Sequence, residues 1–246
     1  EDIGAYVLTN GFVVPERPAA FIPGPYHVRH YLGEVDCVMT IKTPTGSYRG
    51  PGRYEASFVR ERIVDLVARH LGMDPADVRR RNFVQSEQLP YNVGTTAFGH
   101  AIVYDSGTYP DLFERALARI DYASLRDMQK RARAEGRLVG IGLASFVEKS
   151  GVGPWESARI RFDGSGRIEV LTGVTSVGQG VETVLAQICA EQFQVAPQEI
   201  AVRHGDTDLI PLGRGAYGSR GTSTGGGGPS GGAGKSAVKS RGGSRA

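Results

Sequence analysis

The chain of 246 residues is long enough for one large domain or two modest ones, and its 40% hydrophobic and 22% charged content is that of an ordinary globular protein. No apolar run approaches the roughly 18 residues that a membrane span requires. The formal net charge is +3, but every charged residue after Asp208 is basic, so the excess belongs to the C-terminal segment. Because the remainder has no basic stripe with interleaved aromatic residues, neither nucleic-acid binding nor membrane association is indicated.

Cys37 and Cys189 are too few for a disulfide framework and match no metal-ligand spacing. Both lie among apolar neighbours, which predicts buried, reduced and unreactive thiols. The first residues, Glu1 to Gly4, show no secretory leader. Together these observations predict a cytoplasmic protein.

The first 47 residues have the pattern of short strands joined by proline-rich turns, with strands expected over 6–8, 12–14 and 31–40. A glycine-rich loop over 48–53 then leads into a helix that Gly72 ends, in which apolar residues recur at helical spacing: Val59, Ile63, Leu66 and Val67. Asp74 and Pro75 are the residue types that cap and open a further short helix.

The following part mixes helices and strands without strict alternation, which predicts an α+β fold. One helix is expected after Thr108, with an apolar stripe of Leu112, Phe113, Ala116, Leu117 and Ile120, and a surface helix over 124–135. A third follows the loop Gly178-Gln179-Gly180 and turns inward Val184, Leu185, Ile188, Cys189 and Phe193. A buried strand is expected over 138–147, a hairpin over 159–171 turning at 163–166, and a strand over 200–204.

The composition changes at Gly221, after which glycine, serine and basic residues dominate. We predict a disordered tail over 229–246, because too few apolar side chains remain to offset the entropy of ordering. The preceding chain is divided into two parts, 1–136 and 137–228.

Both glycine loops lead straight into a helix, whose first amides have no intrahelical partner and favour an anion. Arg49 and Arg53 flank the first loop and could grip a phosphate or carboxylate, and Gln179 in the second can donate and accept hydrogen bonds. A third cluster, residues 217–224, offers hydroxyls and amides suited to an anion nest. Each feature also has a simpler interpretation. The glycine loops could be structural turns, Arg49 and Arg53 could form surface ion pairs with Glu55 or Glu61, and residues 217–224 could be a solvated loop.

Several motifs occur in the order found in one enzyme family. They are Tyr48-Arg49-Gly50-Pro51-Gly52-Arg53-Tyr54-Glu55, Arg79-Arg80-Arg81-Asn82-Phe83, Val177-Gly178-Gln179-Gly180-Val181-Glu182-Thr183, His204-Gly205-Asp206-Thr207-Asp208 and Tyr217-Gly218-Ser219-Arg220. From about residue 1 to about 228 the chain resembles the large subunit of bacterial molybdenum hydroxylases of the xanthine dehydrogenase and aerobic carbon monoxide dehydrogenase type. The resemblance implies the molybdenum-cofactor-binding domain of that family, present in part, with the chain incomplete at both ends.

The resemblance also implies a set of site residues. Gly178, Gln179 and Gly180 would contact the pterin, and the other cofactor contacts would be Arg49, Gly50, Ser219, Arg220 and Thr222, the last three near the phosphates. A substrate pocket would be lined by Arg17, Tyr48, Arg49 and Pro51. The implied cofactor is a molybdenum-pterin, as molybdopterin cytosine dinucleotide, with no metal ligand from this chain.

The chain departs from the family pattern at several points. Gly221 stands where the family usually has a serine, and Pro51 replaces a small or aromatic residue. The Arg49 loop lacks the cysteine that marks carbon monoxide oxidisers, which argues against that substrate. The family's catalytic glutamate is not found in the chain, so no catalytic residue is assigned and the chain alone is expected to be inactive. A frameshift or truncation near Gly228 would explain the altered tail.

The function implied is that of an oxidoreductase subunit that hydroxylates an electron-poor carbon, of an N-heterocycle or an aldehyde, with oxygen from water. Electrons would leave through partner subunits carrying iron–sulfur clusters and FAD, since this chain has no cysteine run for a cluster. Two other interpretations remain open. One is a non-catalytic fragment whose loops bind nothing, and the other is an unrelated nucleotide- or anion-binding domain.

Overall fold

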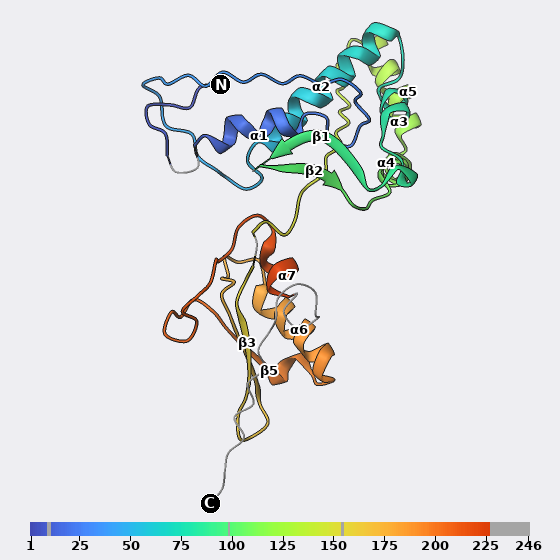
Figure 1. Cartoon of the computed structure of the whole chain (residues 1–246). Helices are drawn as coiled ribbons and strands as arrows, with labels where there is room; N and C mark the ends of the chain where they lie inside the picture. Colours follow the sequence, from blue (N-terminus) through green and yellow to red (C-terminus); the bar gives the residue numbers. More distant parts are fainter. Residues whose placement is uncertain (9–10, 98, 154, 227–246) are drawn as a thin grey trace, which may run out of the picture. The chain divides into compact units, whose positions relative to one another are not determined.

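The computed structural model describes residues 1–8, 11–97, 99–153 and 155–226. The chain divides into two compact units, Glu1–Glu148 and Lys149–Ala246 (Figure 1). Both helices and strands occur in each unit, which confirms the α+β class. The sequence-based division at residue 136 stays a prediction, and the predicted tail over 229–246 lies outside the described residues. No helix among the described residues is long and apolar enough to cross a membrane.

The first unit consists of five helices and one hairpin among the residues described. In chain order the elements are α1 (Val13–Phe21), α2 (Arg53–Leu71), α3 (Pro75–Asn82), the 3-10 turn η1 (Ser86–Gln88), β1 (Tyr91–Ala97), β2 (His100–Tyr104), α4 (Tyr109–Arg119) and α5 (Tyr122–Ala134). As predicted, Gly72 ends α2 in the left-handed conformation, at φ 64°. The Asp74 carboxylate caps α3 by accepting a hydrogen bond from the Ala76 amide at 2.8 Å.

The N-terminal strands predicted over 6–8, 12–14 and 31–40 are wrong. Within the described residues this region has only two isolated bridges, Asp2 with Val38 and Tyr26 with Phe83, and the run from residue 12 leads into α1. A proline-rich turn is present at residues 22–25. However, Pro15 occupies the first turn of α1, where a backbone donor is not needed, and Pro18 lies inside the helix. The β1–β2 hairpin, by contrast, was not predicted.

The α2 helix buries its charged face and exposes its apolar one. The residues whose spacing indicated the helix are 40–50% exposed: Val59, Ile63, Leu66 and Val67. Arg53, Arg60 and Glu61 are buried instead, beside the small residues Ala56 and Ala68. The helical period predicted from the sequence is therefore correct, but it marks a face that is largely exposed in the described part of the chain.

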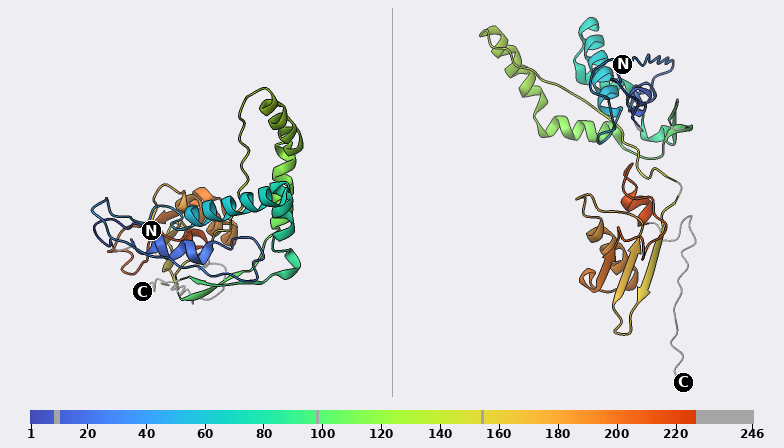
Figure 2. Two further views of the ribbon diagram at one scale, coloured as in Figure 1. Left: turned by 90° about the horizontal axis from the view of Figure 1, so that it is seen from above. Right: turned by 90° about the vertical axis from the view of Figure 1, so that its left-hand side faces the viewer.

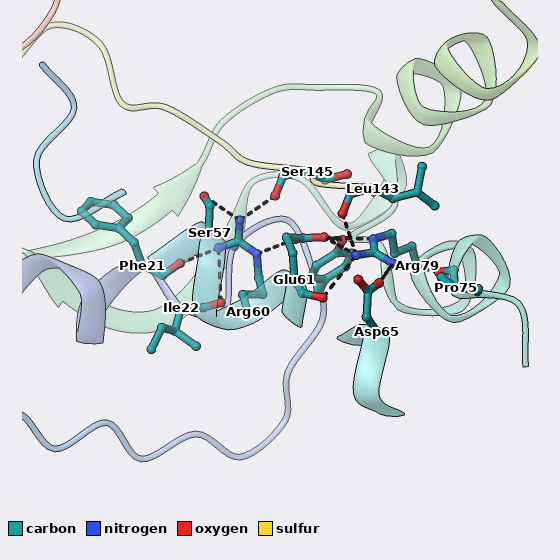
Figure 3. A network of polar contacts seen from close by, with 12 residues as sticks. Phe21, Ile22, Ser57, Arg60, Glu61, Asp65, Pro75, Arg79, Leu143 and Ser145 are labelled. Atoms are coloured by element: carbon teal, nitrogen blue, oxygen red, sulfur yellow. Dashed lines mark hydrogen bonds and ion pairs between the residues drawn. The ribbon is translucent and has the colours of Figure 1, made fainter. Parts of the chain in front are cut away.

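A network of ionic contacts explains why Arg60 and Glu61 of α2 are buried (Figure 3). The Glu61 carboxylate accepts from Arg60 Nε at 2.8 Å and from Arg79 Nε at 2.9 Å. Arg79, which α3 contributes, is fully buried and also donates to Asp65 at 2.9 Å. Since each buried charge faces an opposite charge, the network joins α2 to α3 without an uncompensated ion.

The same two arginines hold other segments in place. Arg60 donates to the carbonyls of Phe21 at 3.1 Å and Ser145 at 2.5 Å, and Arg79 donates to the Leu143 carbonyl at 2.8 Å (Figure 3). They thereby fix the end of α1 and a distant extended segment against α2.

That extended segment, residues 138–147, is not the buried strand predicted. It runs back from α5 (Figure 2), and its residues alternate between half-buried and exposed. Leu138 is 88% and Phe146 67% exposed. In the described part of the chain no strand pairs with it. Side chains rather than a neighbouring strand bind its carbonyls, with Gln129 donating to Val139 at 2.8 Å as a third such contact.

Helix α4 follows Thr108 as predicted, but its apolar stripe is only partly inside. Phe113 and Leu117 are buried and pack with Tyr26 and Phe83 of the unit's core. The other members of the stripe, Leu112, Ala116 and Ile120, are exposed. The charged helix predicted over 124–135 is confirmed as α5.

The second unit is a small mixed sheet with a covering helix. Its elements are β3 (Ala158–Phe162), β4 (Ile168–Thr172), α6 (Val181–Phe193), the 3-10 turn η2 (Pro197–Glu199), β5 (Ile200–Arg203) and α7 (Arg220–Gly225). β4 lies in the middle, antiparallel to β3 and parallel to β5. The predicted hairpin is confirmed, with Asp163 accepting from the Ser165 and Arg167 amides across its turn.

The core of this unit lies between the sheet and α6. Ile168, Val170 and Ile200 pack against Ala186, Cys189 and Ala190. Of the side chains predicted inward, Leu185 and Cys189 are buried, and Val184 and Ile188 are half-buried. The prediction is wrong for Phe193, which is exposed and packs edge-on against Phe162. The buried state is likewise confirmed for Cys189, whose burial raises the pKa of its thiol, and is wrong for Cys37, which is exposed.

Candidate functional site

A cavity of about 370 Å³ lies in the second unit between two separate stretches of chain. One stretch is the second glycine loop with the start of α6, and the other runs from Ala216 into α7. Four predicted site residues line this cavity: Gln179, Ser219, Arg220 and Thr222. The fold therefore brings together two motifs that lie about forty positions apart in the sequence.

The glycine loop forms one wall. Gly178 and Gly180 have φ values of 96° and 72°, a region that favours glycine, and a Cβ built on either would meet no atom within 4 Å. Gly180 immediately precedes α6, a helix of 13 residues whose first amides lack intrahelical acceptors. The wall thus offers open space beside backbone donors, so that a ligand can approach the main chain closely.

Gln179 is exposed and folds back onto its own loop. Its Oε1 accepts from the Val177 amide at 2.6 Å, and its Nε2 donates to the Thr175 carbonyl at 3.0 Å. The amide therefore fixes the loop in this structure. Because the side chain is at the surface, rotation toward a ligand exchanges only these two hydrogen bonds.

The second wall is the turn from Tyr217 to Thr222. Ser219 has φ 53°, which is uncommon for a residue with a side chain, and its backbone accepts from the Gly151 amide at 3.3 Å. The hydroxyl-bearing Ser219 and Thr222 are exposed on the cavity side, whereas Arg220 between them is buried. The exposed donors of this wall are neutral.

Glu156 does not line the cavity but contacts Arg220 behind it, and nothing in the sequence indicated this role. Its side chain is 1% exposed and forms an ion pair with Arg220, which is completely buried, at 2.6 Å. Glu156 lies 64 positions before Arg220, in a stretch without a recognisable motif. No signal in the sequence could have identified the pair, because only the fold brings the two residues together.

A second contact ties the start of α6 to the end of β5. His204 Nε2 lies 2.7 Å from Glu182 Oε1, and the hydrogen bond from His204 is the main cause that lowers the pKa of Glu182. Asp206 accepts from the Asp208 and Leu209 amides at 3.0 and 3.3 Å. Asp206 therefore shapes a turn.

The remaining predicted site residues belong to the first unit. Tyr48 and Arg49 are exposed, and Gly50 and Pro51 are half-buried. Next to them Gly52, at φ 80°, lies against Arg17, because a Cβ at Gly52 would come within 2.2 Å of Arg17 Cβ. The fold therefore places Arg17 of α1 beside this loop, and the roles predicted for these residues stay predictions.

Arg53 does not pair with Glu55 or Glu61, the alternative considered for it. It forms an ion pair with Glu148 at 2.5 Å, and its guanidinium lies 4.3 Å from the centre of the Phe21 ring. The pKa of Arg17 is lowered mainly by burial and, to a smaller extent, by the positive charge of Arg53. The loop is thus held against α1 by a cluster of cations that share one carboxylate.

The cavity has a mixed lining. Val177, Val181 and Val184 contribute apolar surface beside Gln179 and the hydroxyl-bearing Ser219 and Thr222. The glycines of the loop have open space at their Cβ positions, so that a phosphate or the edge of a heterocycle can approach the main chain. No group of three potential metal-ligating side chains (His, Cys, Asp or Glu) occurs among the described residues.

Comparison with known proteins identifies the family of the chain. Two models of the molybdopterin cofactor-binding domain match the chain, one over residues 1–83 and the other over residues 115–235. The chain is 42% identical over 224 residues to the 6-hydroxypseudooxynicotine dehydrogenase complex subunit gamma of Paenarthrobacter nicotinovorans, covering 91% of this chain and 28% of the relative. It is 38% identical to the carbon monoxide dehydrogenase large chain of Hydrogenophaga pseudoflava, covering 81% and 26%.

Solved structures give the same result. Quinoline 2-oxidoreductase from Pseudomonas putida 86 superimposes with a TM-score of 0.80 at 33% identity, over 93% of this chain and 31% of that one. Carbon monoxide dehydrogenase from Oligotropha carboxidovorans gives 0.77 at 32% identity, over 91% and 30%. The chain spans less than a third of the length of these relatives. It belongs to the molybdopterin cofactor-binding domains of the xanthine dehydrogenase and carbon monoxide dehydrogenase family of molybdenum hydroxylases.

Proposed function

We propose that the chain is the part of a molybdenum hydroxylase subunit that grips the nucleotide-bearing end of a molybdenum-pterin, as molybdopterin cytosine dinucleotide. The observation that carries this proposal is the single cavity shared by the Gly178–Gly180 loop and the Tyr217–Thr222 turn. A dinucleotide cofactor has both a polar ring system and phosphates. Two walls with different donors suit these two parts of one ligand.

The two walls of the cavity are proposed to bind different parts of the cofactor. Gly178 and Gly180 let the pterin edge approach the backbone, and Gln179 rotates outward to donate to and accept from it. Ser219 and Thr222 donate their hydroxyls to the phosphates. When bound, the cofactor supplies the metal centre and electron acceptor for hydroxylation with oxygen from water. The chain's own contribution is to hold and orient it.

The loop of the first unit is proposed to serve the substrate. We propose that a substrate pocket is lined by Arg17, Tyr48, Arg49 and Pro51, and that Arg49 and Gly50 also contact the cofactor. The exposed guanidinium of Arg49 can orient a polar substrate through bidentate hydrogen bonds. We propose an electron-poor carbon of an N-heterocycle or aldehyde as the position oxidised. The heterocycle named in quinoline 2-oxidoreductase supports the first class.

The whole protein is proposed to work as a cytoplasmic complex with an iron–sulfur subunit and an FAD subunit. Support comes from the relative that is itself named as the gamma subunit of a dehydrogenase complex. Electrons withdrawn from the substrate need a path away from the site, and the chain's two cysteines cannot hold an iron–sulfur cluster. The catalytic base is assigned to no residue of this chain.

Cofactor content tests the proposal. The chain is purified from a host that makes molybdopterin cytosine dinucleotide. Molybdenum is measured by mass spectrometry, and CMP released by acid is measured by chromatography. We expect both in the wild-type protein and a loss of both in Gly180→Val, because a β-branched residue is strained at positive φ. Gly166→Val is the matched control: Gly166 has φ 83° in the β3–β4 turn, away from the cavity lining.

The same measurement separates the alternatives. Nucleotide without molybdenum would favour an unrelated nucleotide-binding domain. Neither component in the wild-type protein would favour a fragment whose loops bind nothing.

A further inference from the structure

We infer that Arg220 and Glu156 form a buried brace that sets the Tyr217–Ser219 turn for anion binding, and that Arg220 itself does not contact the anion. The inference rests on the proposed function of the cavity. It assigns a role to Glu156 and changes the one that the family resemblance implied for Arg220. Both are positioning residues.

The first argument is that the donors of Arg220 point into the protein. Its Nε donates to the Val152 carbonyl at 3.0 Å, and its Nη1 donates to Glu156 at 2.6 Å and to the Gly215 carbonyl at 3.4 Å. Its Nη2 donates to the Trp155 carbonyl. All three guanidinium nitrogens are therefore engaged, and a phosphate would have to displace existing partners from a side chain with no exposed surface.

The second argument is that Glu156 ties both ends of one turn. Its Oε1 accepts from the Arg214 amide at 3.1 Å, and its Oε2 accepts from the Arg220 side chain. The turn that carries Tyr217, Gly218 and Ser219 lies between these two contacts. A carboxylate that binds the residues on either side of a turn fixes the separation of its ends.

The third argument is that the turn is closely packed and has little conformational freedom. The Val152 amide donates to the Gly218 carbonyl at 3.2 Å, and a Cβ on Gly218 would lie 2.6 Å from Val152 Cβ. The positive φ of Ser219 persists only where surrounding contacts impose it. The brace and this contact together impose it, and the Ser219 hydroxyl consequently stays on the cavity side.

The direction in which one substitution changes anion affinity distinguishes bracing from direct contact. Glu156→Gln removes a negative charge beside an anion site and frees the Arg220 guanidinium. Electrostatic attraction or direct contact predicts tighter anion binding in this variant. Bracing predicts weaker binding, because the amide replaces an acceptor oxygen by a donor and the turn loses one of its ties.

The experiment measures the affinity of the full 246-residue chain for cytidine 5′-diphosphate and for pyrophosphate by titration calorimetry. We expect Glu156→Gln to weaken both by about 10-fold, the equivalent of one lost hydrogen bond. Arg220→Lys should weaken them similarly, although it keeps the charge, because an ammonium cannot reproduce the guanidinium fork. Glu191→Gln, an exposed carboxylate of α6, is the control and should leave the affinity unchanged.

Circular dichroism of each variant without ligand shows whether it is folded. If Glu156→Gln does not fold, Gly218→Ala tests the same turn without changing a charge and should also weaken binding. Unchanged or tighter binding by the folded variants would overturn the brace while leaving the proposed cofactor site standing. Absence of binding by the wild-type chain would contradict both.

Discussion

At the scale of single residues, the chain uses buried arginine–glutamate pairs to hold segments together. In the first unit Glu61 pairs with Arg60 and Arg79, with Asp65 as a second partner of Arg79, and in the second unit Glu156 pairs with Arg220. In both places the guanidinium also binds backbone carbonyls of distant segments. A buried arginine can satisfy several orphan carbonyls at once, which suits regions where loops rather than strands meet.

Replacing Glu61 by glutamine should therefore be costly. Glu61→Gln leaves two buried guanidinium groups with one carboxylate fewer, and we expect the free energy of unfolding of the first unit to fall by about 3–5 kcal/mol. Chemical denaturation followed by circular dichroism measures this. Glu114→Gln is the control, because its pair with Arg80 is about half exposed and should change the free energy by about 0–1 kcal/mol. If both substitutions changed the free energy of unfolding equally, burial of the ion pair would not determine its contribution to stability.

At the scale of elements, the sequence predicted correctly those helix ends and turns that are determined by neighbouring residues. The Asp74 cap of α3, the Asp163 turn and the start of α6 after Gly180 all follow from neighbouring residues. The sequence could not show which face of α2 is buried, because the partners of Arg60 and Glu61 come from α3, from the end of α1 and from Ser145. Nor could it show the brace of the cavity, since Glu156 and Arg220 become neighbours only in the fold.

The segment over 138–147 shows the same limit and yields a prediction. Its alternating pattern is that of a strand, yet in the part of the chain that the structure describes its amides donate to no backbone carbonyl. We expect these amides to exchange with deuterium nearly as fast as those of an unstructured peptide, whereas amides of β4, paired on both sides, exchange slowly. Hydrogen exchange with mass spectrometry measures both in one sample. Protection of 139–147 equal to that of β4 would contradict the unpaired state.

At the scale of the whole molecule, the chain is two units with separate cores. The apolar clusters around Phe21 and around Phe83 contain only residues before 149, and those around Cys189 and Val174 contain only residues after it. The two ionic networks are divided in the same way. Each unit therefore has the interior and the ion pairs needed for its own cooperative unfolding.

Independent unfolding can be tested with the Glu61 substitution. If the units are thermodynamically separate, Glu61→Gln should lower hydrogen-exchange protection in the first unit only, and amides of β4 and α6 in the second should keep their wild-type rates. In rising urea the wild-type chain should accordingly lose protection in two steps. A single step, or equal loss of protection in both units, would mean that contacts between them carry substantial free energy. In that case the cavity residues Gln179 and Ser219 would be sensitive to substitutions in α2.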